Sequence, residues 1–283
     1  MKNSSKMNVS SWLKDATTSI DHLDAELILS NVIQKERIFL HGHPEYELSE
    51  REKAKADNDL ARRQNGEPIA YILGHKEFYG RNFRVTPDTL IPRPETEAII
   101  DEIKSLAYVT SFPHDETLEI LDIGTGSGCI AITLALELPN SQVTAVDIST
   151  KALDCAQYNA QALGASNIST KLSNLFESTP EKYDIIVANL PYVDRNWDWL
   201  DQKTLSYEPE TALYAKDGGL ALIKQTILEA PKHLKRGGYL ILEADLSQHQ
   251  KIRTFATENT DLIPSTSQNH QSLALVLHLP QSA

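Results

Sequence analysis

The amino-acid sequence predicts an α/β protein, in which a mostly parallel sheet with helices on both faces follows a small α-helical domain. From about residue 96 onward, strand-like apolar runs alternate with helical stretches, as in sheets whose crossovers are helices. A glycine-rich turn directly follows one of these strands, at 124–128. The first 75 residues show helical spacing but no convincing strand.

The helical domain is predicted over 1–75 and contains three to five helices. Apolar residues recur near helical spacing between 23 and 33, with polar residues between them. Ser49 is followed by Glu52, a spacing typical of a capping box, so a helix is predicted over 50–64. An Asn-Gly pair then gives a favourable end for that helix.

A linker is predicted over 76–95, between the helical domain and a second domain at 96–283. Aromatic and β-branched residues flank a Gly-Arg-Asn turn within 78–85, which favours a short β-hairpin. Pro92 and Pro94 then stiffen an extended connection.

The second domain is predicted to alternate helices and strands. Helices are expected near 95–108, 127–138 and 150–163. Strands are expected at 118–123, 142–147, 168–172, 184–188, 239–244, 261–264 and 272–279. The last two strands lie too close together for a helical crossover, so the final strand is predicted to be antiparallel.

Composition and charge exclude several classes of protein. Acidic residues outnumber basic ones 39 to 27, which gives a formal net charge of −12 and disfavours direct nucleic-acid binding. Only Cys129 and Cys155 are present, outside any zinc-ligand spacing, so we expect neither a disulfide framework nor a metal site. The N-terminus lacks the apolar core of a signal peptide, and no apolar run is long enough to span a bilayer. We therefore expect a cytoplasmic protein without membrane contacts, and a monomer.

A cofactor site is predicted at the glycine-rich turn, because ligands of α/β sheets bind at the carboxyl ends of strands. The turn consists of Gly124, Thr125, Gly126, Ser127 and Gly128. Asp147 ends the next strand, where a carboxylate can accept both hydroxyl hydrogens of a ribose. A plain strand-to-helix turn is the structural alternative.

Two cofactors fit this layout, S-adenosylmethionine and a dinucleotide. The dinucleotide fingerprint is G-x-G-x-x-G, whereas this turn reads G-x-G-x-G. Asp122, just before the glycines, also favours a cofactor with an amino group over one with a pyrophosphate. The sequence therefore favours S-adenosylmethionine.

A second loop at the same edge of the sheet is predicted to carry the chemistry. The strand 184–188 leads into Asn189, Leu190, Pro191 and Tyr192. An amide nitrogen is a poor nucleophile, and two acceptors for its N–H bonds would fix it in line with a methyl donor. The Asn189 side-chain oxygen and the Leu190 carbonyl are candidates for that pair, and Tyr192 could lie against the substrate's flat face. An Asn-x-Pro turn is also common loop chemistry, which is the structural alternative.

These residues, with several phrases of the linker, resemble the protein-(glutamine-N5) methyltransferases of release factors, the HemK/PrmC type. The resemblance covers about 60–245, and its most specific pieces are 66–74, 77–80, 90–97 and 207–209. It implies a helical N-terminal domain that helps to recognise the partner and a class I, Rossmann-like methyltransferase domain. It also implies S-adenosylmethionine as the cofactor, and the glutamine of the Gly-Gly-Gln loop of peptide-chain release factors as the substrate.

Carried over by position, the resemblance implies a role for each site. The turn 124–128 would wrap the methionine part of the cofactor and Asp147 would hold the ribose. Asn174 and Leu175 would lie beside the adenine, and 189–192 would receive the glutamine, with Asn189 also beside the cofactor. This chain departs from the family where Leu190 replaces a proline and Asn174 replaces an aspartate. The first change removes a restriction on φ, and the second removes a charge near adenine.

Other functions and other residues stay open at this stage. Enzyme alternatives are methylation of another protein, such as a ribosomal protein, or of the N6 amine of adenine in nucleic acid. A noncatalytic adenosylmethionine-binding protein is the alternative of another class, and a dehydrogenase comes last.

Trp197 and Trp199 could form a docking surface for the partner, or they could make ordinary packing contacts. Arg93 and Glu243 could either serve the site or make structural contacts.

Overall fold

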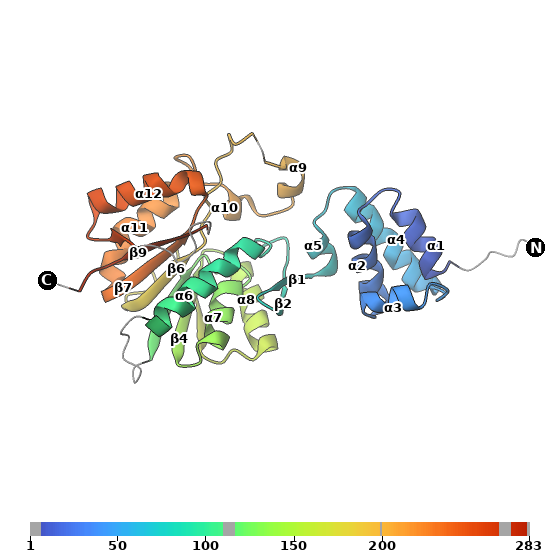
Figure 1. The fold of residues 1–283 in the computed structure, drawn as a ribbon, viewed down its shortest axis with the longest axis horizontal. Coiled ribbons are helices and arrows are strands. Elements are labelled where there is room, and N and C mark those ends of the chain that lie inside the picture. The colour runs from blue at the N-terminus through green and yellow to red at the C-terminus, as the bar shows by residue number, and fades with distance from the viewer. Residues whose placement is uncertain (1–6, 110–116, 199, 266–272, 282–283) are drawn as a thin grey trace, which may run out of the picture. The chain divides into compact units, whose positions relative to one another are not determined.

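The computed structural model describes residues 7–109, 117–198, 200–265 and 273–281 (Figure 1). These residues divide into two compact units, which are described separately. The first unit contains the described residues up to 75 together with Asp201–Tyr207, and the second contains the rest.

The first unit is an array of short helices around one apolar core. Its helices are α1 (Val9–Ala16), α2 (His22–Ile33), α3 (Arg37–Gly42), α4 (Glu50–Gln64), α5 (Ile69–Leu73) and α9 (Gln202–Leu205). Its core contains Trp12, Ile28 and Leu29, all at most 2% exposed. The helical character predicted for this part of the chain is confirmed.

Helix α4 begins at the predicted capping box. The Ser49 hydroxyl accepts from the Glu52 backbone N–H at 3.2 Å, and the Ser49 N–H donates to Glu52 Oε2 at 2.8 Å. Two of the donors that a helix start leaves without partners are thereby satisfied. The chain then turns at Gly66, whose φ of +100° suits glycine.

The segment Asp201–Tyr207 corrects the predicted extent of the second domain. The sequence placed it within 96–283, but it packs with the helical unit. The Tyr207 hydroxyl donates to the Asn65 carbonyl at 3.2 Å, and a Cβ at Gly66 would lie 2.8 Å from Lys203 Cε. Sequence periodicity reports the local element and not its distant partner, so it gave no sign of this association.

The second unit is built on a seven-stranded sheet (Figure 1). Its strands are β3 (Leu118–Ile123), β4 (Ser141–Asp147), β5 (Ile168–Leu172), β6 (Tyr183–Ala188), β7 (Leu234–Glu243), β8 (Ile263–Pro264) and β9 (Ala274–His278). Their order is β5-β4-β3-β6-β7-β9-β8, and β9 pairs antiparallel with both β7 and β8. The predicted parallel sheet with an antiparallel final strand is confirmed.

Helices cover both faces of this sheet and enclose two apolar cores. These helices are η1 (Pro94–Thr96), α6 (Glu97–Val109), α7 (Cys129–Glu137), α8 (Thr150–Leu163), α10 (Glu210–Leu213), α11 (Ala221–His233) and α12 (Leu246–Asn259). Ile120 packs in the core under α6 and α7, whereas its neighbour Leu121 packs in the core under α11 and α12. This alternation follows from the two-residue period of a strand.

The hairpin and the later strands differ in detail from the expectation. The predicted hairpin forms as β1 (His75–Phe78) and β2 (Arg81–Arg84). Strand β7 begins five residues earlier than predicted, because an irregular register at Tyr183 lets the glycine-containing stretch after Leu234 join the sheet. Part of the predicted strand 272–279 lies outside the described residues. Within the described ranges, no helix is both long and apolar enough to cross a membrane.

Candidate active site

The glycine-rich turn folds back over the adjacent strand. The N–H groups of Gly124 and Thr125 both donate to the Val146 carbonyl, at 2.9 and 3.0 Å, and Gly128 N–H donates to the Thr125 carbonyl at 2.8 Å. The three glycines have φ values of +75°, +57° and +82°, which side chains rarely adopt. The turn is thus held by backbone bonds that glycine makes possible.

Neighbouring side chains also pack closely against two of the glycines. A Cβ at Gly128 would lie 2.6 Å from Ile132 Cδ1, and one at Gly124 would lie 3.2 Å from Leu190 Cδ2. A Cβ at Gly126 would meet no atom closer than 4.0 Å, so this residue is open to the cavity. The close packing of the outer glycines therefore fixes the turn, and the middle one leaves room for a ligand.

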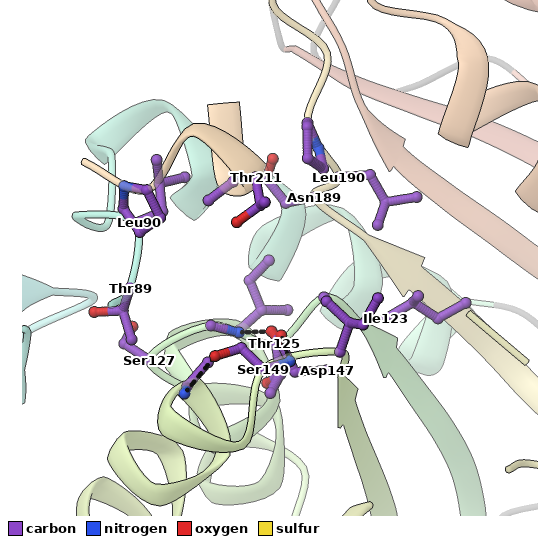
Figure 2. Close-up of a pocket in the computed structure, with 18 of the residues that line it drawn as sticks. Thr89, Leu90, Ile123, Thr125, Ser127, Asp147, Ser149, Asn189, Leu190 and Thr211 are labelled. Carbon is purple, nitrogen blue, oxygen red and sulfur yellow. Dashed lines mark hydrogen bonds between the residues drawn. The ribbon is translucent and has the colours of Figure 1, made fainter. Parts of the chain in front are cut away.

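Asp147 is oriented by two backbone donors. Its Oδ2 accepts from Gly126 N–H and its Oδ1 from Ser149 N–H, each at 2.9 Å (Figure 2). Each carboxylate oxygen has a further lone pair, so Asp147 can still accept from two ribose hydroxyls. Ile148 follows with 68% of its side chain exposed and lines the same cavity, where it offers an apolar surface to a flat base. Sequence reasoning missed Ile148, although an apolar residue directly after the acid was visible.

The predicted site residues other than Gly128 and Tyr192 line one cavity of about 470 Å³, a size typical of cofactor sites. Asn189 and Thr211 lie across this cavity from Asp147 and Ser149 (Figure 2). The cavity brings together the first four residues of the turn, 124–127, with Asp147, Asn174, Leu175, Asn189, Leu190 and Pro191. Residues of the linker and of 209–214 complete its wall.

Asn174 and Leu175 lie after β5. Asn174 Nδ2 donates to Glu177 Oε1 at 3.0 Å, so its Oδ1 is the atom available to accept from an adenine amino group. Leu175 is 6% exposed and adopts a φ of +49°, an uncommon value for a branched residue. An amide oxygen therefore occupies the place where the family resemblance implies a carboxylate.

The Asn189 loop follows β6 and places its side chain at the cavity. Asn189 Nδ2 donates to the Thr96 hydroxyl at 3.4 Å, which leaves Oδ1 as the acceptor that can face a substrate. Leu190 is 5% exposed and belongs to the apolar core, where its side chain packs close to Gly124. A buried leucine therefore stands at the position where the resemblance implied a proline.

Tyr192 is placed beside the cavity and not in its wall. Its hydroxyl donates to Glu243 Oε1 at 3.1 Å, and its carbonyl accepts from Gln248 Nε2 at 2.9 Å. Burial, and then the charge of Glu243, raise the pKa of Tyr192 far above its usual range. A Cβ at Gly219 would lie only 1.9 Å from the Tyr192 carbonyl oxygen, so this glycine is needed for the close approach. Contact of Tyr192 with a substrate stays a prediction.

Arg93 holds the linker in place beside the cavity. The Arg93 guanidinium pairs with Glu208, which is 4% exposed and also accepts from Ile91 N–H at 3.0 Å. These contacts fix the linker, so Arg93 has a structural role while it also lines the cavity.

Asp122 lies under the turn, where its Oδ2 accepts from the Thr125 hydroxyl at 2.7 Å. Burial raises the pKa of Asp122 to about 7.

The remaining candidates are less defined. Trp197 is half-buried and its backbone N–H donates to the Asp194 carbonyl at 3.1 Å, whereas Trp199 lies outside the described residues. In the described part of the chain, no group of three or more His, Cys, Asp or Glu side chains is arranged to hold a metal ion.

Comparison with known proteins agrees with this geometry. The PrmC N-terminal domain family matches residues 8–74, and the methyltransferase small domain family matches residues 98–236. The release factor glutamine methyltransferase of Koribacter versatilis is 42% identical over 238 residues, which cover 83% of each chain. The chain belongs to the release factor glutamine methyltransferase family. The Escherichia coli member is 36% identical over 253 residues, 87% of this chain and 89% of that one.

Solved structures support the fold of this family member. A methyltransferase from Pyrococcus furiosus superposes with a TM-score of 0.53 at 17% identity, over 81% of this chain and 98% of that one. The Thermus thermophilus 16S rRNA N2 G1207 methyltransferase, solved with AdoMet and guanosine, also gives 0.53 at 16% identity, over 74% and 50% of the two chains. The second unit therefore has the class I methyltransferase fold.

The cofactor of this family member is S-adenosylmethionine, and the cavity fits it. Gly126 leaves open space at the cavity, Asp147 keeps lone pairs that can accept from hydroxyl groups, and Ile148 presents an exposed apolar side chain, as this cofactor requires. The chain is thus an S-adenosylmethionine-dependent methyltransferase.

Proposed function

We propose that this enzyme transfers a methyl group from S-adenosylmethionine to the side-chain amide nitrogen of the glutamine in the Gly-Gly-Gln loop of peptide-chain release factors. The observation that carries the proposal is the Asn189 side chain at the cavity, with its Nδ2 directed to Thr96. Its free oxygen and the Leu190 carbonyl offer two acceptors where a primary amide has two donors. The names of the related proteins support the same substrate.

The chemistry follows from the weak nucleophilicity of an amide nitrogen, whose lone pair is delocalised into the carbonyl. Bound S-adenosylmethionine supplies an electrophilic methyl group on its sulfonium. Asn189 Oδ1 and the Leu190 carbonyl oxygen accept from the two N–H bonds, so they orient the nitrogen and stabilise the positive charge that develops on it. The methylated nitrogen is acidic and loses a proton to water, so no strong base is needed at the site.

We also propose a role for the first unit and a setting for the reaction. The helical unit helps to recognise the release factor, because it carries the match to the PrmC N-terminal domain and lies outside the cofactor cavity's lining. Protein synthesis places the substrate in the cytoplasm, which is therefore the expected location. The net charge of −12 favours a protein substrate over a nucleic acid.

Mass spectrometry of a release factor tests the proposal. The factor is incubated with S-adenosylmethionine and either the wild-type enzyme or Asn189→Ala, with Asn259→Ala at the exposed end of α12 as a matched control. We expect one added methyl group on the Gly-Gly-Gln glutamine with the wild type and with Asn259→Ala. The Asn189→Ala rate should fall by about 100-fold or more.

Two results would contradict the proposal. Methylation of a ribosomal protein or of adenine in DNA, but not of the release factor, would assign another substrate. Cofactor binding without transfer to any of these substrates would indicate a noncatalytic binding protein.

A further inference from the structure

Glu243 is a buried carboxyl group directly behind the Asn189 loop. It is the last residue of β7, and the preceding residue, Leu242, pairs with Ala188 at the end of β6. Only 2% of Glu243 is exposed, and it is not part of the cavity wall. A charged group in such a place costs free energy unless its oxygens accept hydrogen bonds.

The two oxygens of Glu243 differ in their hydrogen bonding. Oε1 accepts from the Tyr192 hydroxyl at 3.1 Å. Oε2 is fully buried and makes no hydrogen bond of ordinary geometry with the described residues. Thr96, 2% exposed, and Asn189 lie close enough to lower the pKa of Glu243 by hydrogen bonding, although burial is the larger effect and raises that pKa. Glu243 therefore joins Tyr192, Thr96 and Asn189 in one cluster.

The orientation of the Asn189 carboxamide decides which of its atoms faces the cavity. A carboxamide can be placed with either its oxygen or its nitrogen toward the cavity, and only the oxygen accepts from a substrate amide. The Asn189 nitrogen is directed at the Thr96 hydroxyl, 3.4 Å away. A hydroxyl that accepts from Asn189 keeps its own proton to donate, and the adjacent Glu243 carboxylate is an acceptor only. A Thr96 hydroxyl that donates to Glu243 can only accept from Asn189, so the Asn189 nitrogen then faces Thr96 and its oxygen faces the cavity.

We propose that Glu243 is a positioning residue that fixes the Asn189 oxygen toward the cavity. Oε1 accepts from Tyr192, and the buried Oε2 is the acceptor left for the Thr96 hydroxyl and the Asn189 amide, so both ends of the 189–192 loop would be held by one group. This inference deepens the proposed function and rests on it for the identity of the substrate. The orientation of Asn189, however, is a property of the chain alone.

Glu243→Gln is the decisive variant, because glutamine has the same shape but only one acceptor oxygen. Its amide nitrogen must face either Tyr192 or the Thr96 side, where donors already point, so Asn189 loses its fixed orientation. Glu137→Gln is the matched control, since Glu137 is the last residue of α7, pairs with Arg81 and Lys104, and does not line the cavity. Thr96→Val removes the hydroxyl between Glu243 and Asn189. It therefore tests the same series of hydrogen bonds at its central residue.

The first readout is kinetic. We expect Glu243→Gln and Thr96→Val each to lower kcat by about 10- to 100-fold, because a small misplacement of a substrate acceptor has effects of that size. The KM for S-adenosylmethionine should stay within about threefold of wild type, since the cofactor's own contacts are retained. The double variant should have a kcat little lower than that of either single variant, because both substitutions break the same series of hydrogen bonds. Glu137→Gln should keep the wild-type kcat.

The pH profile separates positioning from packing. Protonated Glu243 has one free acceptor oxygen, as glutamine has, so wild-type kcat should fall toward the Glu243→Gln level as pH falls through the raised pKa of Glu243. The kcat of Glu243→Gln should not show this fall at low pH. Within the described part of the chain, Glu95, Cys129 and Tyr192 are titratable groups that interact with Glu243, and all three are kept in both proteins. The pKa of Asp122 is also raised by burial, and Asp122 is likewise unchanged in both proteins.

An activity-independent readout keeps this inference separate from the proposed function. The enzyme is labelled with ¹⁵N at asparagine, and the Asn189 side-chain signals are assigned as those missing from Asn189→Ala. We expect them to shift or broaden in Glu243→Gln and to stay unchanged in Glu137→Gln. If they shift but the wild type methylates no glutamine, only the proposed function fails. Unchanged Asn189 signals, or a wild-type kcat in Glu243→Gln, would overturn the positioning role.

Discussion

At the scale of single residues, the site combines groups that the sequence could reveal with groups that it could not. The glycine turn and Asp147 were predictable, because positive φ values and a carboxylate at a strand end leave a local pattern. The Glu208 and Glu243 contacts were not, because each joins residues far apart in the chain through burial. Sequence spacing describes neighbours along an element, and these partners meet only after folding.

Leu190 gives the first prediction at this scale. Its side chain is 5% exposed and packs in the core against the glycine turn. Leu190→Ala leaves a cavity there, and we expect the free energy of unfolding to fall by about 2–4 kcal/mol, measured by urea denaturation. Leu228→Ala, at a side chain 46% exposed on α11, should change it by less than about 0.5 kcal/mol. Equal losses would show that Leu190 does not restrain the loop by packing.

Asn174 gives a second prediction, about cofactor affinity. An aspartate at this position would accept from adenine with a full charge, but it would lose the bond to Glu177 and repel that carboxylate. We therefore expect little change in the Kd for S-adenosylmethionine with Asn174→Asp alone, measured by calorimetry. Asn174→Asp combined with Glu177→Gln should tighten binding by about 5- to 10-fold. A gain in the single variant as large as in the double one would argue against coupling of Asn174 and Glu177.

At the scale of elements, local signals account for most of the second unit. Helix 150–163 and strand 168–172 have the predicted bounds, since alternation and capping residues mark their ends. Strand β7 was predicted too short because a glycine pair normally ends a strand, whereas here the irregular register lets the chain pair on both sides of it. The pairing partner, and not the strand's own residues, decides such an extension.

Strand β3 carries a prediction about pH. Burial raises the pKa of Asp122, its fifth residue, to about 7, whereas the unfolded chain ionises this group near pH 4. Between these values the folded state holds the extra proton, so the group destabilises the fold increasingly as pH rises and fully above pH 7. Asp122→Asn removes this dependence. Relative to wild type, its free energy of unfolding should rise by about 2 kcal/mol from pH 5 to pH 8.

Denaturant unfolding at both pH values checks this prediction, with the exposed Asp261→Asn as a control. A difference between Asp122→Asn and wild type that stays constant with pH would contradict it. Cofactor should be left out of the measurement, because a bound ligand adds its own stabilisation.

At the scale of the whole molecule, the chain enters the helical unit twice. The chain first forms α1 to α5 of this unit. It later returns to the unit as Asp201–Tyr207, which begins nine residues after Tyr192 of the 189–192 loop. Composition and periodicity could not predict this return, because four-residue α9 has no pattern of its own. Its consequence is that residues 1–75 do not form the whole unit, so their simple deletion would leave 201–207 without the surface they pack against.

A test of the recognition role of the helical unit must also account for residues 201–207, which belong to that unit. We expect the most informative truncation to remove residues 1–75 and to replace 201–207 by a flexible Gly/Ser linker of equal length. If the unit docks the release factor, it raises the effective concentration of the glutamine at the cavity, so its loss should lower kcat/KM for the whole factor by about 100-fold. For a short Gly-Gly-Gln peptide, which cannot reach a second surface, kcat/KM should change by less than about threefold. Thermal unfolding and cofactor binding of the truncated enzyme show whether the second unit stays intact. Equal losses for factor and peptide in an intact enzyme would mean that the helical unit supports the catalytic unit and does not recognise the partner.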